Sequence, residues 1–260
     1  MRNWLVFFAA LATLIHPCFA EMDWEHLVLV ESAPDQAMAI DALRKGLYSV
    51  QYDAKMKVGE FMRTSPERQN MLVDYISRYR MDQYYLTDGT VEYGFYLSLT
   101  PSILSLLLPA TEPVQLVVPM LCPTCNQDWP AGKEPPAGLQ LQPKAIEESR
   151  YTGIIIDCRG MDLNPCLFPI IFDEEENTVF SVNFTDLDKV VERGVVLYAD
   201  SDSAASSRTG NNPLRIRGSA VVGEGKTDIM ISSREARRIQ GSQNNLTLLR
   251  ECRVAIVSGQ

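Results

Sequence analysis

Hydrophobic positions recur at helical spacing in the first part of the chain. Apolar residues follow one another every three or four positions from Ala37 to Val50, which predicts an amphipathic helix that begins after Pro34 and Asp35. A second helix is expected from residues 64–66, because proline is tolerated in the first turn. A short apolar helix or turn follows over 103–108.

Strand patterns flank these helices. WEHLVLVE over 24–31 predicts a short first strand, and YDAKMKVGEFM over 52–62 is a further candidate strand. DQYYLTDGTVEYGFYLSL over 82–99 places Asp88 and Gly89 between two runs rich in aromatic and β-branched residues. This segment predicts a hairpin, since Asp-Gly supplies the positive φ angles of a tight turn.

The last part of the chain alternates strand and helix patterns. Strands are predicted for TGIIIDCRG, for FPIIFDEEENTVFSVNF as two strands around an acidic turn, and for LRIRGSAVVG, TDIMIS and RECRVAIV. A helix capped by Thr185 and ended by Gly194 is expected, and another whose Ser232 and Glu235 form a capping box. Residues 201–213 predict a polar surface loop.

These patterns predict an α+β protein of two small units of mainly antiparallel sheet packed with helices. The expected units are 21–108 and 150–260. Eight prolines interrupt residues 109–149, which predicts a proline-rich linker between the units.

The first twenty residues have the pattern of a secretory signal. One basic residue precedes an apolar run from Trp4 to Ile15, and Ala20 stands before the acidic Glu21. We expect cleavage after Ala20, with lipidation of Cys18 as the alternative. Pro17 disfavours lipidation, because it directly precedes the cysteine. The chain is therefore expected in the periplasm or at the outer-membrane periphery.

Charge and histidine content restrict the function. A net charge of −9 with scattered basic residues offers no phosphate-binding footprint, so nucleic acid is not an expected partner. Of the two histidines, His16 lies in the signal segment and only His26 remains. A histidine-rich metal site is therefore excluded, and a Ser-His or Cys-His mechanism would depend on this one residue. We predict no metal and no cofactor.

Cys122-Pro-Thr-Cys125 is the sharpest chemical motif. In an oxidising compartment it predicts a small disulfide loop. A redox-active pair remains open, since a thiol at a helix N-terminus is activated, although the following residues cannot form a long helix. A zinc site would require further ligands.

The cysteines that remain after the signal segment are odd in number, so at least one thiol is unpaired within the chain: 122, 125, 158, 166 and 252. Cys158 and Cys166 are a second candidate pair, and Cys252 is expected to be a buried free thiol. Asp157 and Arg159 flank Cys158. No general base is near, so these two residues are interpreted as ending a strand and anchoring a loop.

Three further motifs have structural interpretations. FDEEEN over 172–177 lacks the spacing of an EF-hand and predicts a solvated hairpin tip. GEGKT over 223–227 lacks the phosphate-loop spacing and predicts a turn. Asn183 and Asn245 stand in N-glycosylation patterns.

Two long segments carry a resemblance to known proteins. LTDGTVEYGFYLSL and TGIIIDCRGMDLNPCLFPIIFDEEE, with the segments that follow each, resemble bacterial envelope proteins related to the Lpp-type membrane lipoproteins and the flagellar-assembly lipoprotein FlgP. The resemblance implies assembly in envelope structures and no enzymatic activity. It also implies alanine where this chain has Cys158 and Cys166, and it supplies no catalytic or ligand residues.

The sequence therefore predicts a non-enzymatic assembly or structural protein related to flagella or another envelope structure. Its expected partners are envelope or flagellar proteins and further copies of itself, with peripheral association to the outer membrane. Its working surfaces are expected at the edges of the two units and at residues 201–213. The alternative is a thiol-redox protein that uses Cys122 and Cys125. A small-ligand or peptidoglycan-binding module is a third hypothesis, for which the sequence shows no pocket.

Overall fold

The computed structural model describes residues 20–85, 87, 89, 91–110, 114, 120–125, 127, 129–130, 133–143 and 150–259. Residues 1–19, which hold most of the predicted signal segment and Cys18, lie outside this set, as does Asp88 of the predicted hairpin turn. Within the described residues, no helix has both the length and the apolar character needed to cross a membrane.

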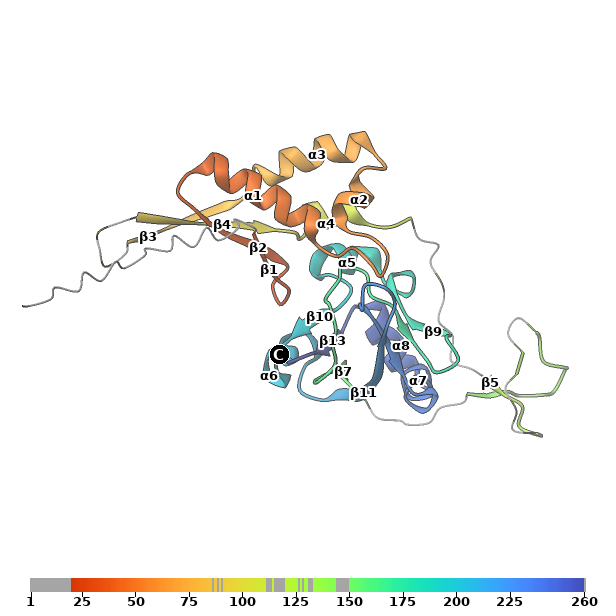
Figure 1. The fold of residues 1–260 in the computed structure, drawn as a ribbon. Coiled ribbons are helices and arrows are strands. Elements are labelled where there is room, and N and C mark those ends of the chain that lie inside the picture. Colours follow the sequence, from red (N-terminus) through yellow and green to blue (C-terminus); the bar gives the residue numbers. More distant parts are fainter. Residues whose placement is uncertain are drawn as a thin grey trace, which may run out of the picture.

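The N-terminal unit is an antiparallel sheet with helices on one face (Figure 1). The strands, in sheet order, are β1 (Glu21–Asp23), β2 (Val28–Ala33), β4 (Val91–Ser98) and β3 (Arg80–Tyr85). The helices are α1 (Gln36–Ser49), α2 (Val58–Met62), α3 (Pro66–Ile76) and α4 (Ser102–Leu107). Alternate residues of the central strands, among them Leu29, Phe95 and Leu97, are buried under the helices.

Local chemistry places these elements. Asp35 caps α1 by accepting from the Met38 N–H, and Ser65 caps α3 in the same way before Pro66. The predicted hairpin is confirmed by the β3–β4 pairing, with Gly89 at φ +86°. The predicted strand over 52–62 is wrong. Asp53 accepts from two backbone N–H groups that follow it, and the chain turns into α2.

The C-terminal unit contains a seven-stranded mixed sheet. Its strands, in sheet order, are β10 (Leu197–Ala199), β13 (Val254–Val257), β7 (Gly153–Asp157), β11 (Pro213–Val222), β12 (Asp228–Ile231), β8 (Ile171–Phe172) and β9 (Thr178–Phe180). Only the β11–β12 and β8–β9 pairings are antiparallel. The α+β class is confirmed, while mainly antiparallel pairing holds for the N-terminal sheet alone. The helices α6 and α8 pack beside β7. Helix α6 joins β10 to β11, and α8 leads into β13.

The helices of this unit are α5 (Leu187–Arg193), α6 (Asp202–Thr209), α7 (Ser233–Gln240) and α8 (Gln243–Arg250). Helix α6 replaces the polar loop predicted for 201–213, because Ser201 caps it and Ala205 is buried on the sheet. The predicted cap of α5 is also displaced by one residue. Asp186 accepts from the Asp188 N–H, whereas the Thr185 hydroxyl donates to the Val182 carbonyl. Ser232 caps α7 as expected.

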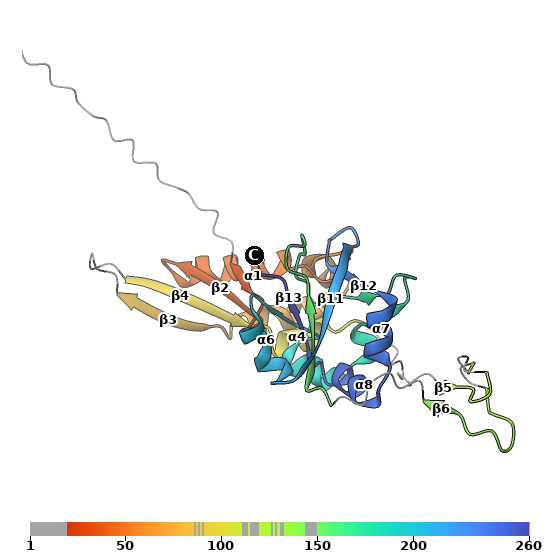
Figure 2. The ribbon, with the colours of Figure 1, turned by 90° about the horizontal axis from the view of Figure 1, so that it is seen from below.

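The proline-rich segment forms a separate small sheet of β5 (Met120–Leu121) and β6 (Gln142–Pro143). Figure 2 shows this sheet and the β3–β4 hairpin at opposite ends of the molecule.

The two units share one hydrophobic core. The backbone of 51–52 accepts hydrogen bonds from Leu167 and Phe168, each at 3.0 Å, and the Tyr52 ring lies 4.8 Å from that of Phe168. Leu27 packs at the end of α5, where Gly194 has φ +79°. A Cβ atom there would lie 2.8 Å from Leu27 Cδ1, so this contact requires glycine.

The shared core predicts coupled unfolding. Phe168→Ala is expected to lower the free energy of unfolding by about 3 kcal/mol or more, because Phe168 is almost fully buried between the units. Hydrogen exchange should show protection falling together in β2, β4 and β7, and denaturant titration gives the magnitude. Phe172→Ala, at a half-buried strand position, is the control and should cost less. Loss of protection in one unit alone would contradict a shared core.

Candidate functional site

Cys122 and Cys125 lie in the turn that follows β5. Both are free thiols, Cys122 half-buried and Cys125 exposed. Hydrogen bonds to the backbone of Cys125 and Thr124, and then to the Cys125 thiol, lower the pKa of Cys122. The turn therefore brings the two thiols together and favours thiolate at the first. The disulfide expected here remains a prediction.

The other three cysteines are buried, and their thiols are held in the protonated form. Burial raises the pKa of Cys158, Cys166 and Cys252 to about 12 in each case. The Tyr198 hydroxyl donates to the Cys166 carbonyl and accepts from the Cys166 N–H, both at 3.1 Å. Cys158 instead lies against Gly218. A thiol with so high a pKa is almost entirely protonated at neutral pH, which is typical of structural cysteine.

His26 is exposed and close to a carboxylate. Its Nδ1 lies 2.9 Å from Asp23 Oδ2, in the turn between β1 and β2. Among the residues that the structure describes, the His26 ring forms a hydrogen bond with Asp23 and with none of the five cysteines. The arrangement fits a surface histidine that stabilises a turn.

The acidic motif over 172–177 forms the turn between β8 and β9, as predicted. Asp173 accepts from the backbone of Glu175 and Asn177, so its carboxylate organises the turn. Among the described residues, no three His, Cys, Asp or Glu side chains are grouped as metal ligands. The 223–227 segment is likewise a turn, in which Lys226 pairs with Asp162.

Asn183 and Asn245 differ in accessibility. Asn183 is exposed, whereas Asn245 is 2% exposed and donates to the Arg238 carbonyl from within α8. Of the two glycosylation patterns, only the one at Asn183 presents its side chain to a modifying enzyme.

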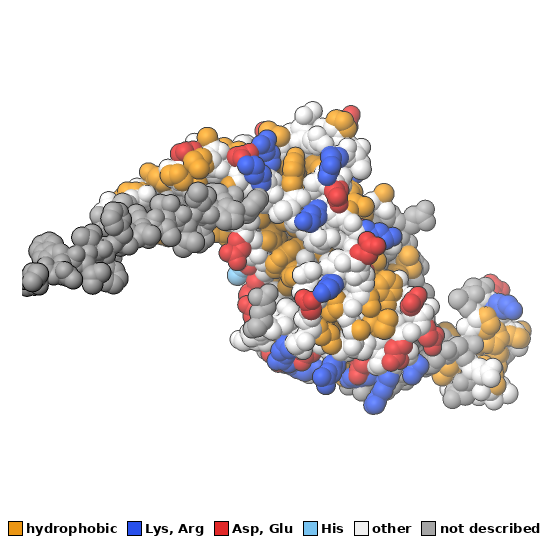
Figure 3. All heavy atoms as spheres, viewed as in Figure 1, with side chains coloured by type: hydrophobic (Ala, Val, Ile, Leu, Met, Phe, Trp, Pro, Cys, Tyr) orange, Lys and Arg blue, Asp and Glu red, His pale blue; other side chains and the backbone are white. Residues whose placement is uncertain are grey.

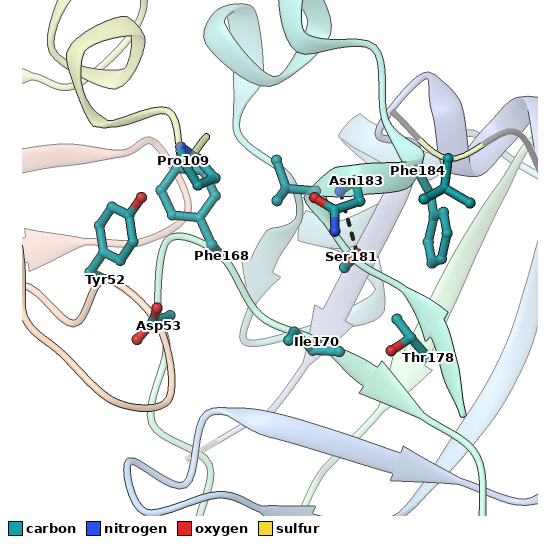
Figure 4. Close-up of a pocket in the computed structure, with 11 residues that line it drawn as sticks. Tyr52, Asp53, Pro109, Phe168, Ile170, Thr178, Ser181, Asn183 and Phe184 are labelled. Carbon is teal, nitrogen blue, oxygen red and sulfur yellow. Dashed lines mark hydrogen bonds between the residues drawn. The ribbon is translucent and has the colours of Figure 1, made fainter. Parts of the chain in front are cut away.

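A pocket of about 400 Å³ lies where the two units meet (Figure 4). Tyr52, Asp53 and Pro109 come from the N-terminal unit and its continuation. Phe168 of the C-terminal unit lies beside Tyr52 and Pro109, and Asn183 lies across from them. The Tyr52 hydroxyl is buried without a hydrogen-bond partner among the described residues, and burial raises its pKa. The described lining is mostly apolar, and no hydrogen bond within it joins a nucleophile to a base. It is a cleft in the contact between the units, which the sequence did not predict.

The β3–β4 hairpin carries four of the eight large hydrophobic side chains that are exposed among the described residues. Five of the six β3 residues are exposed, and Met81, Tyr84 and Tyr85 are 51%, 45% and 78% exposed. On the open face, the Tyr84 and Tyr96 hydroxyls are 2.5 Å apart over Gly94. A Cβ at Gly94 would lie 2.9 Å from the Tyr84 ring, so the absence of a side chain makes room for this pair. The hydrophobic pattern predicted the strands, but not which residues would remain uncovered.

A comparison with models of protein families matches the C-terminal unit. Residues 153–260 match the model of a protein family described as the second domain of Tp0624 from Treponema pallidum. The matched span begins at the first residue of β7 and contains every strand of the seven-stranded sheet. No curated protein matches the chain. The similarity therefore concerns the C-terminal unit, and the resemblance to Lpp-type and FlgP proteins stays a prediction.

The thiols should separate into two classes. In protein that has first been mildly reduced, iodoacetamide at neutral pH is expected to modify Cys122 and Cys125 within minutes, because they are accessible and the pKa of Cys122 is lowered. Cys158, Cys166 and Cys252 should react only after denaturation, because burial keeps them protonated and covered. Peptide mass spectrometry after timed quenching measures this. Early modification of Cys158 in folded protein would contradict the assignment, and labelling in denaturant is the control.

Proposed function

We propose that this chain is a non-enzymatic assembly protein of the bacterial cell envelope. It would act in the periplasm or at the outer-membrane periphery, associating with further copies of itself and with envelope or flagellar proteins. The observation that carries the proposal is the open edge of the N-terminal sheet at β3.

The edge has the properties of a strand-pairing site. β3 ends the strand order and pairs only with β4 among the described strands, so one side of its backbone has no strand partner. Such an edge is a template for another strand, with main-chain hydrogen bonds that give affinity. In Figure 1 the β3–β4 ribbon extends beyond α1 and α3. The approach of a second chain is therefore not obstructed by the helices.

Charge is distributed unevenly along this edge. Arg80 and Asp82 form an ion pair at 3.0 Å in the inner half of β3, and Arg80 also lies over the Tyr96 ring. The outer half, Gln83–Tyr85, carries no charge. Charged side chains on an edge oppose pairing. The outer half of β3 is thus the part best suited to contact a second chain.

The envelope and flagellar part of the proposal rests on the sequence resemblance and on the signal pattern of the first twenty residues. The matched family contributes a likeness of the C-terminal unit to one Treponema pallidum domain. Buried, protonated thiols at 158, 166 and 252 and a surface histidine at 26 are compatible with a structural role.

Thiol-redox chemistry is the second candidate function. Cys122 favours it, because a free thiol with a lowered pKa stands beside a second accessible thiol. This function would belong to the small β5–β6 sheet alone. Thiol-redox chemistry would not depend on the β3 edge.

Assembly should depend on the β3 edge. Tyr85→Lys is expected to weaken self-association about tenfold or more, because it removes an exposed aromatic side chain and places a charge on the uncharged half of β3. Sedimentation velocity over a concentration series measures this. Val73→Lys, at a position 60% exposed on α3, is the matched control and should associate as the wild type does. Equal association of all three proteins, or a strictly monomeric wild type, would count against the proposal.

The redox candidate has a separate test. If the motif is catalytic, the wild type reduces insulin in the presence of dithiothreitol and Cys122→Ser abolishes that activity, since the low-pKa thiol is the nucleophile. Cys252→Ala, at a buried thiol, should retain full activity. A wild type without reductase activity excludes this candidate.

A further inference from the structure

A recess of about 570 Å³ opens on the C-terminal sheet, outside the contact between the units. The residues that line it are Ile155, Asp157, Arg159, Arg215, Ile216, Arg217 and Glu235. Figure 3 shows basic side chains, with acidic ones between them, along the lower edge of the molecule over α6, β11 and α7. This concentration of arginine contrasts with a chain whose net charge is −9.

Sheet geometry places these side chains together. β7 and β11 are parallel neighbours, with Arg215 opposite Ile155 and Arg217 opposite Asp157. Side chains two residues apart on a strand share a face, so these four residues lie on the same face. Helix α6 covers the adjoining part of that face, where Ile155 is buried. The two arginines of β11 stand just beyond the helix.

Three of the arginines around the recess are already matched by carboxylates. Arg159 binds Asp157 with both nitrogens of its fork, at 2.9 and 2.5 Å. Arg215 pairs with Asp202 and Arg238 with Glu235, each at 2.8 Å. The bidentate contact lowers the pKa of Asp157 to about 2, so this carboxylate remains ionised.

Arg217 is the exception. Its side chain is exposed, and no carboxylate of the described residues lies within ion-pair distance of it. It acts on Asp157 only at longer range, with a smaller effect on the pKa than Arg159 has. The lining of the recess therefore carries one uncompensated positive charge on a planar group with several donors.

The position of Arg217 in the sheet is also that of a ligand-binding residue. Its partner Asp157 is the last residue of β7, and the neighbouring parallel strand β13 ends at the same level, with Val257 opposite Asp157. Ligands of open sheets with parallel strands bind outside the carboxyl ends of those strands.

We propose that this recess binds a small ligand through a carboxylate held by Arg217. The guanidinium fork matches a planar carboxylate, as the Asp157–Arg159 contact in the same recess illustrates. A single unmatched charge suits a monoanion, because the ionised Asp157 repels a dianionic phosphate more strongly than a carboxylate. The recess is larger than a carboxylate and falls in the size range of small-ligand sites. The rest of the ligand therefore lies within it, where Asp157 and Glu235 accept hydrogen bonds.

The test compares two probes that differ only in their anion. N-acetyl-alanyl-alanine, with a free carboxylate, and its C-terminal carboxamide are titrated into ¹⁵N-labelled full chain, and the arginine Nε–H signals are followed by NMR. The carboxylate is expected to shift the Arg217 signal in a saturable way, and the carboxamide to leave it unchanged. Equal responses to the two peptides, or no response to the carboxylate at millimolar concentration, overturns the proposal.

Variants assign the effect to the residue. Arg217→Gln should weaken binding of the carboxylate about tenfold or more, since it removes a charge-assisted contact. Arg217→Lys should keep only part of the wild-type affinity, because a lysine lacks the planar fork of the guanidinium group. Arg250→Gln removes another exposed arginine, on α8, and should bind as the wild type does. Equal losses of affinity in Arg217→Gln and Arg250→Gln would mean that the ligand is attracted unspecifically. An Arg217-dependent response to inorganic phosphate alone would make the recess a phosphate site. Either result overturns the proposal. The β3 edge is not involved, so the outcome is independent of self-association.

Discussion

The contact between the 51–54 turn and the loop that follows β7 holds the molecule together. Backbone bonds at Gln51 and Tyr52 fix Leu167 and Phe168, and Ala54 accepts from Gly225 on the far side of the same turn. Aromatic rings from both units fill the space between these bonds. Because each unit covers part of the other, neither sheet completes its core alone. The inter-unit pocket exists only as a consequence of this contact.

Burial separates the cysteines whose thiols stay protonated from the one whose thiol is activated. The same type of thiol is protonated at 158, 166 and 252 and activated at 122, because the first three are covered by core and the last meets backbone donors in an exposed turn. Among the described residues, the activated thiol lies in the β5–β6 segment, the exposed apolar strand edge lies at β3, and the arginine recess lies in the C-terminal unit.

The segment around Cys158 also contributes to the arginine recess. In GIIIDCRG, Cys158 points into the core, while Asp157 and Arg159 on either side of it pair with one another at the surface. Alternation along the strand causes this division. The residues that flank the cysteine, and not the thiol, are therefore placed where a ligand could reach them.

Periodicity and capping determined the local elements, since they depend on neighbours in the chain. The α1 helix after Asp35, the β3–β4 hairpin, the end of α5 at Gly194 and the cap of α7 at Ser232 all follow from such signals. Tertiary structure decided the features that depend on contacts between residues far apart in the sequence. Ser201 and Ala205 make a helix of a polar stretch because Ala205 is buried against a sheet, and the parallel order of β7, β11 and β13 pairs strands distant in sequence. The exposure of β3 depends on which elements pack against it, and the unmatched charge of Arg217 depends on which carboxylates lie near it. Long-range packing alone sets both.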